Sequence, residues 1–388
     1  MPGLVITTGV RVGAAGTAAA PGSALFIVGT AERGPTGEYK LIESMAQAEA
    51  IYGEYDSTGT LYDHLRTFFE EGGTRAYTVR VVDPAATAGG KAADLTFGGL
   101  TVSQVGPGSW SQDLALRSPA GILQTTGGVA RRVKATYNGE VLYVSGDLLT
   151  NEEIKEALDA NVGNYITTTV ASSAAPTTGA SATTFAGTGN HYNSTVTDAQ
   201  LIDALDYFVP DLGTGVVTIP DTAEATIITD YADIWEGIRD HALDNNRIAF
   251  GAFGADVVIG DTSCLAFYWP WVTVPNETNG TRDISPESFA AAARCRAHVA
   301  TGPWRPWAGA LTAARFVSGL RTAVNSVASD AANIARINPL RVIEGSVRTY
   351  GARSISADET NWRFITFRDT LNFIVVGAER RLEPYIFT

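Results

Sequence analysis

Residues 61 to 82 read Leu61-Tyr-Asp-His-Leu-Arg-Thr-Phe-Phe-Glu-Glu-Gly-Gly-Thr-Arg-Ala-Tyr-Thr-Val-Arg-Val-Val82, and this stretch decides the fold class. Its first half carries large apolar residues at the spacing of one helical face, namely Leu61, Leu65, Phe68 and Phe69. Gly72-Gly73 ends this helix, and the alternating residues from Arg75 onwards predict a strand that stops at Asp83-Pro84. A helix followed at once by a strand is the repeating unit of an α/β protein.

The same alternation of helices and strands continues on both sides. Upstream, residues 24–28 predict a short buried strand, and Ser44 with Gln47 forms the capping box of a short helix. Downstream, the pattern predicts helices over 197–208 and 230–244, strands over 215–219, 247–250 and 265–274, and a helix opened by Ser285-Pro286. We therefore predict one discontinuous α/β core domain, formed by residues 24–84 and 198–388.

The segment between the two parts of the core has a different composition. Residues 85–197 are rich in Gly, Ala, Ser and Thr, and short strand candidates such as 141–144 are separated by turns such as Asn138-Gly139. One helix is predicted with Asn151 as its cap, and residues 167–189 indicate a long exposed loop. This segment is predicted to be an inserted, β-rich outer domain.

The chain begins with a segment that has no obvious partner nearby. Residues 4–12 predict a strand because of their branched side chains, and residues 13–22 are a Gly- and Ala-rich tether without a hairpin signal. We interpret residues 1–23 as an extended arm that adds a strand to another chain. The apolar residues expected to make that contact are Leu4, Val5, Ile6, Val10 and Val12.

Charge and hydropathy limit the possible partners and locations. The 388 residues carry a net charge of −13, which disfavours a protein that coats nucleic acid. No apolar run is long enough to cross a membrane, and Arg11 interrupts what would be the apolar part of a signal peptide, so we expect synthesis and assembly in a cytoplasm. Residues 1–281 carry −18 and residues 282–388 carry +5, so one copy can attract another head to tail.

The sequence lacks the motifs that carry familiar chemistry. The nucleophile-elbow, zinc-protease, dinucleotide and phosphate-loop patterns are missing, and the four histidines lie far apart. Asp203, Asp206 and Asp211 suit a helix exit better than a metal site, and Cys264 and Cys295 cannot form a disulfide framework. We expect no enzymatic activity, no cofactor and no metal. Two alternatives stay open: a glycan-binding adhesin that uses Tyr268-Trp-Pro-Trp271 and Trp304-Arg-Pro-Trp307, or an enzyme with an unrecognised carboxylate site.

Several segments, in order along the chain, resemble the contractile tail sheath family of phages and related contractile injection particles. Residues 28–35 are similar to the family's "VG…ERGP" turn, and residues 62–81 are similar to its helix, double-Gly and strand unit. Residues 106–110 resemble its "PGxWGN" motif, although Ser111-Gln112 replace Gly-Asn. Further matches are residues 268–272 and 302–309, and above all 337–341, 350–356 and 362–368, which look like "INPIR…WGARTL…WRYINVRR".

This resemblance implies a structural subunit that polymerises helically around an inner tube, in a phage tail or a contractile injection particle. The implied partners are other sheath subunits, the inner tube protein, the baseplate and the tail terminator or cap, with no nucleic acid and no membrane insertion. Relatives continue past a segment like residues 382–387 with a further helix and strand, whereas this chain ends at Thr388. Tyr385, Ile386 and Phe387, which lie within the segment that matches, are a candidate carboxy-terminal contact segment.

Overall fold

The structure, a computed structural model, describes residues 24–83, 94–125, 128–179, 181–185, 195–221, 231–253 and 261–382. It confirms the predicted mixed α/β class. Its main body is built on a sheet of eight strands in the order β2-β3-β1-β13-β14-β15-β19-β20. The strands are β1 (Ala24–Gly29), β2 (Lys40–Ile42), β3 (Arg75–Arg80), β13 (Gly215–Thr218), β14 (Ile248–Ala252), β15 (Leu265–Trp269), β19 (Ile337–Ile343) and β20 (Ser346–Thr349).

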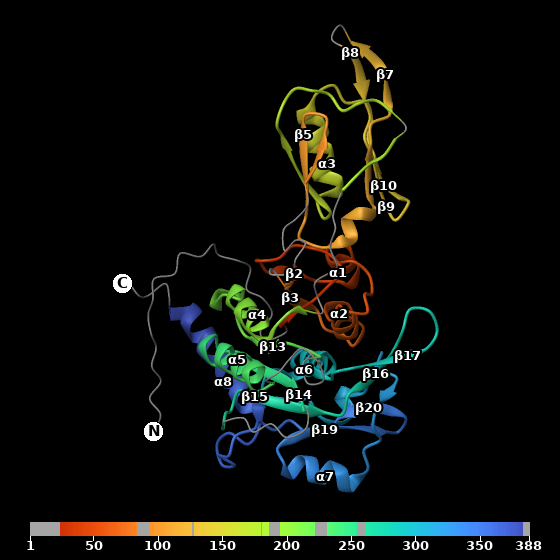
Figure 1. The fold of residues 1–388 in the computed structure, drawn as a ribbon. Helices are drawn as coiled ribbons and strands as arrows, with labels where there is room; N and C mark the ends of the chain where they lie inside the picture. Colours follow the sequence, from red (N-terminus) through yellow and green to blue (C-terminus); the bar gives the residue numbers. More distant parts are fainter. Residues whose placement is uncertain are drawn as a thin grey trace.

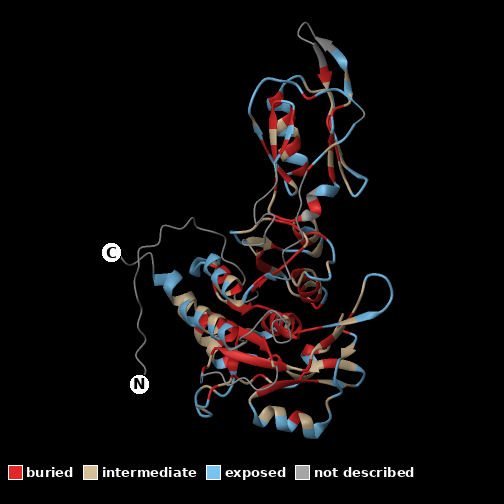
Figure 2. Cartoon of the chain, in the orientation of Figure 1, coloured by how far each residue is buried: buried red, intermediate tan, exposed pale blue. Residues whose placement is uncertain are grey.

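The strands from β3 to β19 run parallel, and the two edge strands, β2 and β20, are antiparallel to their neighbours. Helices α1 (Met45–Tyr52), α2 (Leu61–Glu70) and α6 (Glu287–Thr301) pack on one face of this sheet. Helices α4 (Asp198–Asp203) and α5 (Tyr231–Asp244) pack on the other face, with η3 (Ala204–Tyr207). Because helices cover both faces, β1 is buried along its whole length (Figure 2).

The predicted stripe on α2 points inward. Leu61, Leu65 and Phe68 are fully buried against the sheet, and each such side chain contributes about 1.5 to 3 kcal/mol of hydrophobic stabilisation. Residues 61 to 80 thus form the helix-and-strand unit that their pattern indicates.

Residues 94–185 form a separate body that stands away from the main sheet at the top of Figure 1. It has its own hydrophobic core, centred on Leu100, Trp110, Leu114 and Leu158. Its elements are β4 (Asp94–Phe97), β5 (Leu100–Gln104), η1 (Ser109–Asp113), β6 (Leu114–Arg117), β7 (Ala120–Thr125), β8 (Gly128–Arg131), β9 (Lys134–Tyr137), β10 (Glu140–Val144), α3 (Asn151–Val162), β11 (Ile166–Val170) and β12 (Thr183–Thr184). We call this body the insert.

Two local predictions need correction. Residues 265–274 are not one strand: the chain leaves the main sheet after β15, at the cis peptide bond Trp269-Pro270, and continues as β16 (Val272–Pro275) in another sheet. Proline lacks the N–H group that a continuing central strand would need. The cap of α3 is Thr150 instead of Asn151, and its side chain accepts a hydrogen bond from the Glu153 amide.

The remaining elements complete the end of the main body that lies farthest from the insert. Strand β16 pairs with β17 (Thr281–Ile284) on one side and β18 (Gly319–Leu320) on the other. Helices α7 (Ser326–Ile334) and α8 (Ile365–Leu382) follow, with the short turns η4 (Pro210–Leu212) and η6 (Gly309–Thr312) elsewhere in the core. Within the described residues, no helix is long and apolar enough to cross a membrane.

Candidate assembly surfaces

The residues that the sequence assigns to contacts with other chains lie outside the described part of the structure. This applies to Leu4, Val5, Ile6, Val10 and Val12 of the arm, and to Tyr385, Ile386 and Phe387. The described residues nevertheless include three distinct features: the joint between insert and core, the exposed face of α8, and the free edge of β17.

Arg33 is the centre of the joint. Its buried guanidinium donates hydrogen bonds to the carbonyl oxygens of Glu49, Ala50 and Ile51, at the end of α1 in the core. The same guanidinium lies 4.1 Å from the ring centre of Tyr165 in the insert and donates to its hydroxyl. A cation held over an aromatic ring in a buried position contributes about 2 kcal/mol. Arg33 thus binds core and insert at once.

Further contacts fix the angle of the joint. The Tyr137 hydroxyl of the insert donates to Glu32 Oε1 at 2.7 Å, and buried Arg80 at the end of β3 donates to the carbonyl oxygens of Gly34 and Pro107. The backbone at Gly106 approaches so closely that a Cβ there would overlap the Gly34 carbonyl oxygen. Gly106 also has a φ of +78°, which glycine adopts without strain. The insert and the core are therefore held as one body.

Helix α8 lies across the amino ends of the parallel strands. The Asn372 side chain donates to the Arg247 carbonyl oxygen, just before β14, and the Arg380 guanidinium lies against Gly213, just before β13. The insert leaves from the opposite, carboxyl ends of β1 and β3 (Figure 1). The insert and α8 therefore occupy opposite edges of the sheet.

The buried face of α8 is mainly polar. Asp369 is fully buried and accepts two hydrogen bonds from Arg294 of α6, at 2.7 and 2.6 Å. His298 Nε2 lies 3.1 Å from the same carboxylate. Burial raises the pKa of Asp369, but the Arg294 charge and the hydrogen bond from His298 lower it, and the balance puts it at about 2, so the group stays ionised. A charged, hydrogen-bonded pair anchors this helix to the core.

The opposite face of α8 is apolar and faces outward. Phe367, Ile374 and Leu382 are 50, 58 and 50% exposed, and they follow one another along one side of the helix. A surface helix normally turns its apolar face to the core and its polar face to water. This reversed arrangement leaves an apolar strip exposed on the surface of the subunit. We call it the α8 stripe.

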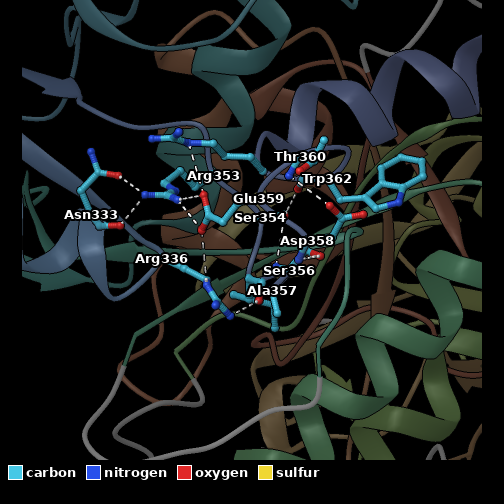
Figure 3. A network of polar contacts seen from close by, with 12 residues as sticks. Asn333, Arg336, Arg353, Ser354, Ser356, Ala357, Asp358, Glu359, Thr360 and Trp362 are labelled. Carbon is cyan, nitrogen blue, oxygen red and sulfur yellow. Dashed lines mark hydrogen bonds and ion pairs between the residues drawn. The ribbon is translucent and has the colours of Figure 1, made fainter.

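The loop that leads into α8 is held by a polar network (Figure 3). The Glu359 carboxylate binds the Arg353 guanidinium through both oxygens and lies 3.7 Å from Arg336 Nε. Arg353 also donates to the carbonyl oxygen of Asn333 in α7, and the Ser354 hydroxyl donates to the Trp362 carbonyl oxygen. The segment that leads into α8 is thereby tied to α7.

Strand β17 is an edge strand. It pairs with β16 and has no second strand beside it within the described ranges. Arg282 of β17 binds the Asp63 carboxylate of α2 through two nitrogens and also Glu277, so the hairpin of β16 and β17 is fixed to α2 near its turn. Because one row of its backbone groups faces no neighbouring strand, β17 can accept a strand from another chain.

Charge is distributed unevenly around these features. A cleft of about 290 Å³ between α4 and α5 is lined by Asp198, Asp233 and Glu236. The α8 end carries Arg380 and Arg381, both exposed. The cleft residues belong to the acidic part of the sequence, and these two arginines belong to its basic part.

The aromatic segments do not form a sugar platform. Tyr268 and Trp307 are buried, and the Trp307 indole donates to the Tyr268 hydroxyl at 2.7 Å. Trp304 is exposed, but the rings of Tyr268 and Trp307 do not reach the surface beside it. Among the described residues, no group of three or more His, Cys, Asp or Glu side chains is arranged to hold a metal ion.

Comparison with known proteins gives a result at the level of structure. No model of a protein family and no curated protein sequence matches the chain. A sheath tail protein from Listeria innocua superposes with a TM-score of 0.66 at 12% identity, over 94% of this chain and 77% of that one. A sheath tail protein from Desulfitobacterium hafniense gives a TM-score of 0.64 at 13% identity, over 97% and 83%.

The contracted helical sheath of the anti-feeding prophage is also similar, with a TM-score of 0.55 and 15% identity over 100% of this chain and 77% of that chain. The alignments cover the insert as well as the core. The chain therefore has the fold of contractile sheath proteins.

Proposed function

We propose that this protein is the structural subunit of a contractile tail sheath. It polymerises helically around an inner tube and contracts to drive the tube through a target cell envelope. The observation that carries this proposal is the sheath fold over 94 to 100% of the chain, insert included. The particle is a phage tail or a contractile injection particle, whose baseplate and terminator bind the ends of the sheath.

The amino-terminal arm links neighbouring subunits in this proposal. Leu4, Val5, Ile6, Val10 and Val12 lie against a neighbour, and the arm adds a strand to the free edge of β17. Support comes from the open edge of β17 and from Asp283, an exposed acidic residue on that strand, which suits Arg11 of the arm. Tyr385, Ile386 and Phe387 form a second contact of this kind. Contacts that pass from one copy to the next without closing generate a helix.

The α8 stripe faces the inner tube in this proposal. The stripe and the insert lie at opposite edges of the sheet, so an insert on the outside of the particle leaves α8 on the inside. The reversed polarity of α8 supports this assignment, because a water-exposed helix gains nothing from presenting Phe367 and Ile374 to solvent. Arg380 and Arg381 would add attraction to an acidic tube surface.

Deletion of residues 1–20 tests the arm. We expect the shortened protein to remain a folded monomer, because the described core makes its contacts without those residues, and we expect it to form no tubes in negative-stain microscopy. A matched control replaces residues 13–22 with a Gly/Ser linker of equal length, which keeps the strand and its reach and should still assemble. Normal tubes from the shortened protein would refute the role of the arm.

A further inference from the structure

A buried group of ionisable residues lies beneath the base of the β16–β17 hairpin. His64 of α2 is completely buried, with Nδ1 at 2.8 Å from Ser288 Oγ and Nε2 at 2.9 Å from Asp221 Oδ2. Asp221 follows β13, and Ser288 lies in the first turn of α6. The group therefore joins three elements at the carboxyl edge of the sheet.

Asp221 connects this group directly to the hairpin. Its Oδ1 accepts a hydrogen bond from the Ser285 amide at 2.9 Å, and its own amide donates to the Ser285 hydroxyl at 2.9 Å. Ser285 is the residue that follows β17. Asp221 has a φ of +58°, a left-handed conformation that non-glycine residues adopt only when their surroundings hold them there. The reciprocal hydrogen bonds and the bond to His64 provide that restraint.

Glu287 adds a second carboxyl group to the same site. It is buried in the first turn of α6, its Oε1 accepts from the Ala252 amide at 2.8 Å, and its Oε2 has no hydrogen-bond partner in the described part of the chain. Burial raises the pKa of Glu287 to about 7. Burial alone would lower the pKa of His64, but the charge and hydrogen bond of Asp221 outweigh it and raise that pKa.

The surrounding charges favour the protonated state. The charged groups that face His64 are Asp221 from the end of β13, Glu287 from α6 and Asp63 from α2. The carboxylate of Asp63 is bound by Arg282 of β17. An imidazolium paired with Asp221, together with a neutral Glu287, leaves little uncompensated charge in the site. Loss of these protons as the pH rises leaves the buried Glu287 as an anion near the half-buried Asp221 carboxylate, beside a neutral His64.

We propose that His64, Asp221, Ser285 and Glu287 form a proton-dependent latch that holds the β16–β17 hairpin to the core. The latch is closed when His64 and Glu287 carry their protons and loosens as the pH rises and these protons are lost. The part of this inference that concerns assembly rests on the proposed function: a loosened hairpin presents a less ordered β17 edge to the arm of a neighbour, so alkaline conditions weaken subunit linkage.

The dispersed subunit tests the latch itself. Both raised pKa values mean that the folded state binds protons that the unfolded chain has released, so stability falls as the pH rises. We expect the thermal midpoint of a wild-type subunit to drop by several degrees between about pH 6 and about pH 8. Glu287→Gln, which stays neutral, should show a much smaller drop. Glu152→Gln, the same change at an exposed position of α3, should behave like the wild type.

Infrared spectroscopy of the wild type gives a second measurement that does not depend on a variant folding. A protonated buried carboxyl group gives a carbonyl stretching band at about pH 6 that disappears towards about pH 8. Absence of this band at both pH values would overturn the latch. An equal drop in thermal midpoint for the wild type and Glu287→Gln would also overturn it.

Assembly is measured separately as the fraction of protein that sediments as tubes. We expect this fraction to fall several-fold from about pH 6 to about pH 8 for the wild type and much less for Glu287→Gln. A pH-dependent midpoint in a protein that forms no tubes at any pH supports the latch and argues against the sheath function. Tubes that form equally at both values, with the midpoint shift present, support the sheath function and refute the link between latch and arm.

Discussion

At the scale of single residues, Arg247 shows how the core accommodates a buried charge. Its guanidinium donates to the carbonyl oxygens of Gly213, Phe208 and Val209 and lies 3.8 Å from the ring centre of Phe26. One nitrogen lies 2.6 Å from His241 Nε2, which must accept this bond and is therefore unprotonated. This cluster closes the amino edge of the sheet beside α8.

The pairing with Arg247 makes His241 a source of acid sensitivity. Burial and the Arg247 charge lower the pKa of His241 to about 3, against 6.5 in a model compound. Between these values the unfolded chain binds a proton that the folded state does not, so stability falls as the pH falls through this window. We predict that His241→Gln, which retains a hydrogen-bond acceptor for Arg247, loses less free energy of unfolding than the wild type as the pH falls through this window. The difference should be up to about 3 kcal/mol.

Urea unfolding of the wild type and the variant, at about pH 7 and at about pH 4, measures this difference in the free energy of unfolding. These two pH values span most of the range between the two pKa values of His241. If the two proteins lose the same free energy of unfolding between these conditions, His241 is not responsible. The latch at His64 and Glu287 acts in the opposite direction, so the subunit should be most stable at mildly acidic pH.

At the scale of elements, α8 allows its two faces to be tested independently. Asp369→Asn removes the charge that pairs with Arg294 and leaves a buried guanidinium uncompensated, which costs about 3 to 5 kcal/mol. We predict a marked loss of stability for this variant, measured by urea unfolding. Ile374→Ser, on the exposed stripe, should leave the free energy of unfolding within about 0.5 kcal/mol of the wild type.

The same Ile374→Ser variant should bind inner tube protein more weakly in a cosedimentation assay, because it removes apolar area from the proposed contact. Glu379→Gln, an exposed change on the same helix, is the matched control for substitution in α8 as such. Unchanged binding by Ile374→Ser would exclude the stripe from the tube contact.

The elements also show how far the sequence leads. Strands β1 and β3 and helix α2 could be predicted because their apolar spacing is local and tertiary packing agrees with it. Helix α8 was not among the predicted elements, and the face that it turns inward is decided by Arg294, 75 residues away. The joint depends likewise on Arg33 and Tyr165, separated by 132 residues. Such long-range pairings leave no local pattern, and the break at Pro270 was missed because its neighbours all favour strands.

At the scale of the whole molecule, the joint makes the subunit a single rigid unit. Arg33, Arg80 and Gly106 hold the insert to the core through buried contacts. Contraction of a polymer of such subunits is then a change in the packing between subunits, with each subunit largely preserved. Flexible links between copies are needed to keep neighbours attached during this change, which is the role proposed for the arm.

The contacts that are rearranged in this way should depend on salt. Residues 1–281 carry −18 and residues 282–388 carry +5, and the acidic cleft between α4 and α5 and the arginines at the end of α8 display this division on the surface. Exposed charges attract across about 10 Å at 0.1 M salt and across only about 3 Å at 1 M salt.

We predict that the protein concentration needed for tube formation, measured by sedimentation, rises several-fold over this range of sodium chloride. The thermal midpoint of the dispersed subunit should change far less, because its buried ion pair of Arg294 with Asp369 is screened little by salt and exposed ion pairs contribute little to stability. Polymerisation that is indifferent to salt would mean that apolar contacts and strand addition alone hold the subunits together.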